Sequence, residues 1–193
     1  MLSRGKIIDK LIFLDVDGVI NHTSWYRWIK SHPDFLKEGG HRNIDPKSVD
    51  RIIKICDEAN AYIVLSSSWR LWDFEQTLDN LKRIRDLRPI LDRMVGITPR
   101  TEERNRGKEI QFFLNACETE LSYPGYDLKF IVHPGYYLKR KGIFVNPHPK
   151  YIILDDEPDM LDNQQQYFIH INDEVGITHK DVENAIKILN ESN

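Results

Sequence analysis

The clearest indication of the fold comes from residues 11–18, LIFLDVDG. Its first four residues are apolar, which is enough for a short buried strand. The run ends in two aspartates, Asp15 and Asp17, and Gly18 then permits a sharp turn out of the strand. We therefore predict a buried strand that carries two carboxylates at its carboxyl end.

Similar apolar runs recur along the chain and alternate with segments of helical periodicity. Further strands are expected at 62–65, 94–97, 151–154 and 168–171, and helices over 45–56, 74–81, 107–117 and 178–189. This alternation predicts an α/β fold, a Rossmann-like, mostly parallel five-stranded sheet with helices on both faces.

The composition is that of an ordinary globular domain. The 193 residues carry 27 basic and 30 acidic side chains, a net charge of −3, and 40% of them are hydrophobic. This apolar content excludes wholesale disorder, and the charge balance excludes a generally basic protein that coats nucleic acid. We expect a single domain over residues 1–193.

The cysteines and the apolar runs bear on the cellular compartment. Cys56 and Cys117 are too few for a disulfide scaffold and lie in helical patterns, which favours reduced thiols. The apolar runs are far shorter than a bilayer-spanning helix, and the first residues lack the charged-then-apolar pattern of a leader. We expect a soluble, cytoplasmic protein with no membrane partner, and the oligomeric state is left open.

Two long segments interrupt the alternation of strands and helices. Residues 22–43, rich in aromatics, Gly and His, are expected to form a small cap-like insertion. Residues 122–150 hold two apolar stretches on either side of Lys139-Arg140-Lys141, which predicts a β-hairpin with a basic turn. Long connections of this kind commonly serve as lids, binding surfaces or contacts.

Polar side chains follow three of the predicted strands: Asp15 and Asp17, then residues 66–70, then Asp155 and Asp156. Because ligands bind at the carboxyl ends of parallel strands, we expect these groups to converge on one site. Gathered carboxylates repel each other, and a hard cation such as Mg²⁺ relieves the repulsion through oxygen ligands. The Asp-x-Asp pair alone is better explained by turn formation or helix capping, but the second acidic pair favours a metal site.

The segment 66–70 could also meet a phosphate. Ser66 and Ser67 could cap the next helix or hold a phosphate oxygen, and the two roles are compatible. Trp69 and Arg70 would add a stacking surface and a phosphate donor, although a surface arginine is more often simply solvated.

Arg106 and Lys108 open the helix predicted near Gly107. The helix dipole opposes positive charge at this end of a helix. The placement therefore favours a negative group nearby, either a substrate or one of the neighbouring glutamates.

Together these segments resemble the four motifs of the haloacid dehalogenase (HAD) superfamily of phosphohydrolases, in the order of that superfamily. FLDVDG at 13–18 resembles the first motif, VLSS at 64–67 the second, RGKEI at 106–110 the third and ILDD at 153–156 the fourth. A narrower resemblance, over nearly the whole chain, is to the HAD domains of RNA-repair and phage proteins.

The resemblance implies a role for each acid. Asp15 would be the nucleophile that forms an aspartyl-phosphate, and Asp17 would protonate the leaving oxygen and then activate water. The implied cofactor is Mg²⁺, held by Asp15, the backbone carbonyl of Asp17 and one of the acids Asp155 and Asp156. The sequence leaves open which of the last two binds the metal.

The resemblance also implies that one serine and one cation balance the charge on the phosphoryl oxygens. The serine is Ser66 or Ser67, because three consecutive serines make the second motif ambiguous. The usual order of the third motif aligns Arg106 with the catalytic lysine, but the sequence leaves Arg106 and Lys108 both open.

The implied reaction is hydrolysis of a phosphomonoester. A short insertion at 22–43 would leave the site open to a polymer end, which suits a nucleic-acid 3′-phosphatase of end repair with Arg70 and residues 139–141 as backbone contacts. The overall acidity counts against that substrate, so a nucleotide or small-molecule phosphatase is the alternative. A noncatalytic module that binds phosphate or metal is the rival from another class, and an aspartate-based phosphotransferase or mutase is a third possibility.

Overall fold

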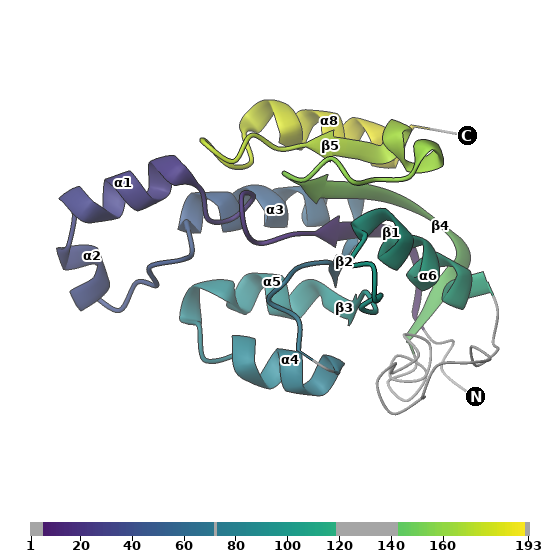
Figure 1. Ribbon diagram of the computed structural model, residues 1–193, viewed down its shortest axis with the longest axis horizontal. Coiled ribbons are helices and arrows are strands. Elements are labelled where there is room, and N and C mark those ends of the chain that lie inside the picture. Colours follow the sequence, from purple (N-terminus) through teal and green to yellow (C-terminus); the bar gives the residue numbers. More distant parts are fainter. Residues whose placement is uncertain (1–5, 72, 119–142, 192–193) are drawn as a thin grey trace.

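The computed structural model describes residues 6–71, 73–118 and 143–191. Five parallel strands form a sheet in the order β3-β2-β1-β4-β5, which confirms the predicted α/β class (Figure 1). The strands are β1 (Lys6–Leu14), β2 (Tyr62–Leu65), β3 (Met94–Ile97), β4 (Ile143–Asp155) and β5 (Phe168–His170).

The strand β1 lies at the centre of the sheet, between β2 and β4. Its residues 11–14 are fully buried, as a parallel sheet covered on both faces requires. The register aligns Leu14 with Leu65 of β2 and with Leu154 of β4. The three central strands therefore reach the same level at their carboxyl ends.

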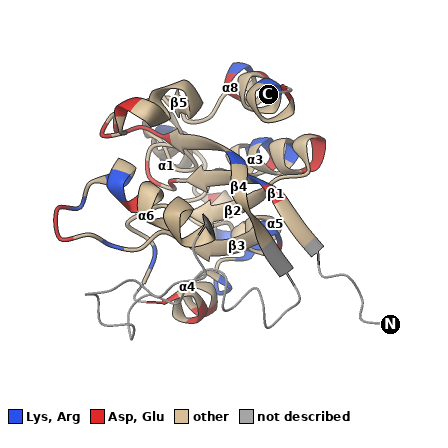
Figure 2. Ribbon diagram, turned by 90° about the vertical axis from the view of Figure 1, so that its right-hand side faces the viewer, with Lys and Arg blue, Asp and Glu red and all other residues tan. Residues whose placement is uncertain are grey.

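Helices cover both faces of the sheet, with α3, α5 and α8 on one face and α6 on the other (Figure 2). The helices are α1 (Thr23–Ser31), α2 (Asp34–Lys37), α3 (Pro46–Ala59), α4 (Phe74–Leu81), α5 (Arg88–Arg93), α6 (Arg106–Glu118) and α8 (His179–Asn190), with short 3₁₀ helices at Arg85–Leu87 and Asp162–Tyr167. Among these described helices, none combines the length and the apolar character needed to cross a bilayer.

Capping residues set the ends of the helices. Asp45 is the N-cap of α3 and accepts a hydrogen bond from a first-turn amide, while Pro46 takes the first helical position as predicted. The same helix ends at Asn60, whose backbone is left-handed with a φ of 53°. Thr178 and Asp181 form the predicted capping box of α8.

The beginning of β4 differs from the prediction. The strand starts at Ile143 instead of at 151–154, because residues 143–145 pair with residues 6–8 of β1 before the register shifts. The last part of the segment 122–150 therefore belongs to the central sheet, while the other arm of the predicted hairpin lies outside the described residues. The basic cluster of the predicted hairpin turn lies outside the described residues.

Residues 22–43 form an arm that contains α1 and α2 and extends from the sheet (Figure 1). The rings of Trp25, Trp28 and His32 stack along α1. Phe35 of α2 packs edge-on against both tryptophans. The arm thus has a small aromatic core of its own.

A buried pair joins the two ends of the arm. His22, the N-cap of α1, places Nε2 3.1 Å from Oδ2 of Asp45, the N-cap of α3. Burial raises the pKa of Asp45, but hydrogen bonds from His22, the Lys47 amide and Ser48 outweigh burial and lower it. The arm is thereby anchored directly after the turn that follows β1.

Candidate active site

Three strand ends meet at the carboxyl edge of the sheet. The residues that follow the three aligned leucines are Asp15, Ser66 and Asp155, so the register places these residues side by side. Backbone hydrogen bonds continue past the strand ends, from Asp15 N to Leu154 O at 3.0 Å and from Ser66 N to Leu14 O at 2.8 Å. The predicted convergence of the three polar groups thus follows from strand pairing.

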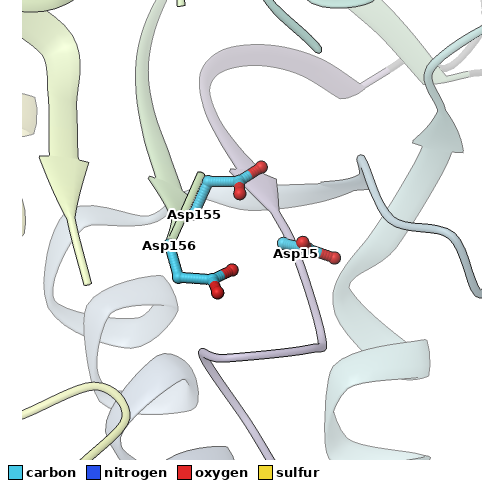
Figure 3. Close-up of side chains that lie close together, drawn as sticks. All are labelled: Asp15, Asp155 and Asp156. Atoms are coloured by element: carbon cyan, nitrogen blue, oxygen red, sulfur yellow. The ribbon is translucent and has the colours of Figure 1, made fainter. Parts of the chain in front are cut away.

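Asp15, Asp155 and Asp156 form a cluster in which each side chain offers a carboxylate oxygen within 4.8 Å of the others. Figure 3 shows Asp15 at the end of β1 and the other two at the end of β4. Asp15 and Asp155 are buried, and Asp156 is half-buried. The Asp17 carboxylate is not part of this cluster of described side chains.

Burial raises the pKa of all three clustered carboxyls. The pKa of Asp155 rises to about 8 and that of Asp156 to about 6, and in both the negative charge of Asp15 adds to the effect of burial. Burial also raises the pKa of Asp15, although the charge of Arg106 and a hydrogen bond from Ser67 oppose the shift. The cluster is therefore an electrostatically unfavourable set of acids when nothing but protein surrounds it.

A hard divalent cation suits this cluster. Within the described residues, Oδ2 of Asp155 is buried and accepts no hydrogen bond, although Nε of Arg106 lies 3.1 Å away. A buried oxygen without a donor is destabilising. A cation that takes oxygen ligands would satisfy it and offset the repulsion, so the side chains present fit Mg²⁺.

The structure brings one of the two candidate cations of α6 to the acids. Nη2 of Arg106 lies 3.4 Å from Oδ2 of Asp15, and its Nε contacts Asp155. Lys108 is exposed and pairs with Glu103 instead. Residues two apart on a helix point about 200° apart, so only one of the two can face the site.

Asp159, in the segment after β4, binds the first backbone amides of α6. The Asp159 carboxylate accepts a hydrogen bond from Arg106 N at 2.8 Å, and its backbone carbonyl accepts one from Gly107 N at 3.3 Å. A Cβ at position 107 would meet Leu161 N at 2.6 Å and Gln164 Oε1 at 2.8 Å. The glycine therefore allows the close approach that places Arg106 beside the acids.

The three consecutive serines have three different neighbours. Ser66 is buried and accepts a hydrogen bond from Thr98 Oγ1 at 3.2 Å. The Ser67 side chain is hydrogen-bonded to Asp15. Ser68 Oγ donates to Oδ2 of Asp17 at 3.0 Å. Of the two candidate serines, the structure thus places Ser67 beside the candidate nucleophile, whereas Ser66 contacts Thr98.

Asp17 is exposed and is held by side chains from two segments. Nδ2 of Asn21 donates to its Oδ1 at 2.8 Å, and Nε1 of Trp69 lies 3.0 and 3.1 Å from its two oxygens. The Trp69 ring is half-buried and packs against the core. Its polar edge therefore faces an acid of the site, a contact that the predicted stacking role did not include.

Arg70 does not face solvent as the predicted phosphate donor would. Its side chain is 3% exposed and pairs with Glu109, and its Nη1 donates to Ser67 O at 2.5 Å. Burial lowers the pKa of Arg70 to about 10, although the charge of Glu109 opposes this. In the structure Arg70 fixes the backbone of residues 66–70 against α6.

The turn after β1 needs a glycine at position 18. Gly18 has a φ of +72°, a conformation that side chains rarely adopt, and an added Cβ would collide with the Asp156 carboxylate. The turn can approach the end of β4 this closely because position 18 has no side chain.

Sequence reasoning did not find several residues of the site. Asn21 lies four residues after Asp17, and its side chain donates to the Asp17 carboxylate and accepts a hydrogen bond from Gly18 N at 3.1 Å. Glu109 is one of the neighbouring glutamates that the sequence offered as partners of Arg106, and its Oε2 lies 3.9 Å from Nη1 of Arg106, but its pairing with Arg70 was not expected. Arg100, which donates to the carbonyls of Ser68 and Arg70, gives no local signal in the sequence.

Comparison with known proteins agrees with this arrangement. A family model described as the HAD domain in Swiss Army Knife RNA repair proteins matches residues 11–123, more than half of the chain. The matched stretch includes the ends of β1 and β2 and the start of α6, while the acids of β4 lie beyond it. Searches of curated proteins and of solved structures returned no significant match. The chain belongs to the HAD domains of Swiss Army Knife RNA repair proteins.

Proposed function

We propose that the chain hydrolyses phosphomonoesters with Mg²⁺ and that Asp15 is the nucleophile. The observation that carries this proposal is the position of Asp15 at the end of the central strand, beside the acids of β4 and in contact with Arg106. Membership of the HAD family supports a phosphohydrolase-type reaction.

The reaction would proceed in two steps. First, a carboxylate oxygen of Asp15 attacks phosphorus, the bond to the ester oxygen breaks, and Asp17 gives a proton to the leaving oxygen. Second, Asp17 takes a proton from water, the water oxygen attacks phosphorus, and the bond to Asp15 breaks to release phosphate. Asp17 is exposed and lies outside the acid cluster, which suits proton exchange with both the leaving group and water.

The remaining residues would manage the charge of the phosphoryl group. Asp15, Asp155 and Asp156 would hold the cation, which supplies positive charge to the phosphoryl oxygens when bound. Arg106 adds a second positive charge from the start of α6. Ser67 holds the Asp15 carboxylate through its hydrogen bond, so the nucleophile is oriented before substrate arrives.

The test of this proposal is phosphate release from p-nitrophenyl phosphate, with Mg²⁺ and with a chelator. We expect release only with the cation, and we expect Asp15→Asn to lower it by at least about 1,000-fold, as removal of a nucleophile does. Asp50→Asn makes the same change on the exposed side of α3 and should leave release intact. Unchanged release by Asp15→Asn would remove Asp15 as the nucleophile.

We further propose a phosphorylated nucleic-acid 3′ end as the substrate. The matching family is described by its RNA repair proteins. The arm at 22–43 has four basic and two acidic residues, a charge of +2, so the rest of the chain of net −3 carries −5. The charge of Asp17 contributes to the raised pKa of Tyr26, after burial, which is consistent with an arm close to the site.

A panel of substrates at one enzyme concentration tests this choice. It compares 3′-phosphorylated DNA and RNA, 5′-phosphorylated ends, nucleotides and sugar phosphates. We expect a preference for 3′ ends above about tenfold, which corresponds to about 1.4 kcal/mol in the barrier. A comparable preference for free nucleotides or sugar phosphates would show instead that the substrate is a small phosphoester.

A further inference from the structure

The carboxylate of Asp17 receives three side-chain hydrogen bonds. The indole N–H of Trp69 lies 3.0 and 3.1 Å from its two oxygens, Ser68 Oγ is 3.0 Å from Oδ2, and Asn21 Nδ2 is 2.8 Å from Oδ1. An exposed aspartate in water would otherwise sample several rotamers. The three donors select one of them, and two donors come from the loop that follows β2.

The loop at residues 66–70 is itself fixed in place. The Trp69 ring packs against the hydrophobic core, and its backbone N donates to Ser67 Oγ at 3.3 Å. The buried Arg70 binds Ser67 O and Glu109, and Arg100 binds the carbonyls of Ser68 and Arg70. The indole N–H is therefore presented by a rigid group on a rigid segment.

The same loop also touches the candidate nucleophile. Ser67 is hydrogen-bonded to Asp15, and the next two residues bind Asp17. Residues of one short segment thus contact both carboxylates that the proposed reaction uses. The relative position of the two carboxylates is set by this segment as well as by the turn that joins them.

We propose that Trp69 is a positioning residue that holds the Asp17 carboxylate for proton transfer, so that its indole N–H contributes to the protonation of the leaving group and to the activation of water. This inference rests on the proposed function, because Asp17 must be the acid and base of the reaction. Trp69 itself need not touch the substrate.

The leaving group provides a selective readout. An alkyl phosphate expels an alkoxide, which needs a proton from Asp17, whereas p-nitrophenolate leaves without one. The value of kcat/KM reports the steps up to release of the leaving group, and kcat also includes hydrolysis of the aspartyl-phosphate. A misplaced Asp17 therefore affects kcat/KM for an alkyl ester but not for p-nitrophenyl phosphate, while it lowers kcat for both.

The test is Trp69→Phe, which keeps an aromatic ring and removes the N–H. For an alkyl ester such as glycerol phosphate we expect kcat/KM to fall by about tenfold or more, within the range of acid–base catalysis. For p-nitrophenyl phosphate we expect kcat and KM to fall together, so that kcat/KM changes by less than about threefold. Trp28→Phe makes the same chemical change on α1 and should alter kcat/KM for the two esters by one common factor.

A second readout needs neither metal nor substrate. In the metal-free ¹⁵N-labelled protein, the indole N–H resonance that Trp69→Phe removes identifies Trp69. We expect Asp17→Asn to shift this resonance more than the other indole resonances, because the carboxylate that accepts its hydrogen bond is replaced. Where Trp69→Phe folds poorly, the Trp69 resonance is assigned by elimination from Phe variants of the other three tryptophans.

The outcomes separate the inference from the function beneath it. Selective loss on the alkyl ester together with a shifted resonance supports the positioning role. Equal loss on both esters, no loss on either, or an unmoved indole resonance overturns it, even if Asp15→Asn abolishes release. Full activity of Asp15→Asn, or absence of phosphatase activity in the unsubstituted chain, instead overturns the proposed function.

Discussion

Asp155 is buried at the end of β4, where burial and the charge of Asp15 raise the pKa of its carboxyl to about 8 from an ordinary value of 3.8. Between these pH values the folded chain holds a proton that the unfolded chain has lost. The contribution of Asp155 to the free energy of unfolding of the metal-free protein should therefore be highest below about pH 4 and should fall as pH rises to about 8.

This shift predicts that Asp155→Asn stabilises the metal-free protein. At pH 8 in the presence of a chelator, urea unfolding should show a free energy of unfolding more than about 1 kcal/mol above that of the unsubstituted chain. The difference should shrink toward pH 4. Added Mg²⁺ should stabilise the unsubstituted chain and have little effect on the variant.

The exposed Asp50→Asn serves as the control for a change in net charge, and we expect it to be neutral. A variant at position 155 that is less stable than the unsubstituted chain at pH 8 would contradict the account of the cluster as a set of uncompensated acids.

At the scale of elements, the start of α6 determines where Arg106 lies. Because Asp159 accepts the hydrogen bond of Arg106 N, Asp159→Ala removes a partner from the first turn and should lower the free energy of unfolding by about 1 kcal/mol. It should also lower kcat/KM for phosphate release, because Arg106 is no longer held beside Asp15. Thermal unfolding and steady-state kinetics measure the two effects.

Thr178→Ala is the matched control for this prediction. It removes the N-cap of α8, which should destabilise the fold by a similar amount, about 1 kcal/mol, without altering kcat/KM of the folded protein. The same kcat/KM in the two variants would show that the hydrogen bond from Arg106 N to Asp159 does not affect the site.

The elements themselves were largely predictable, because buried strands and capped helices have strong local signals. Residues 11–14 and 62–65 are continuous apolar runs, and Asp45 with Pro46 marks the start of a helix. Residues 143–145 were expected in a hairpin and not in β4, because Pro147 and Pro149 separate them from residues 151–154 and proline usually argues against a strand inside a sheet.

At the scale of the whole molecule, the site depends on contacts between segments far apart in sequence. The sequence indicated that Asp15, Ser66 and Asp155 converge, because parallel strands end at one edge of the sheet. The burial of Arg70 was not predictable, since its partner Glu109 lies 39 residues away on a different element. Which of Arg106 and Lys108 faces the acids depends on the rotation of α6 about its axis, which tertiary packing sets.

The central claim is that Asp15 takes the phosphoryl group, and Asp17→Asn offers the most direct measurement of it. This variant should still release p-nitrophenolate, which needs no proton, but should hydrolyse the aspartyl-phosphate slowly. Rapid mixing with p-nitrophenyl phosphate and Mg²⁺, followed by acid quench and mass spectrometry, should show a burst of about one p-nitrophenolate per chain and a phosphoryl group on Asp15. Steady release without a burst and without phosphorylation, or a phosphoryl group on another residue, would contradict the account.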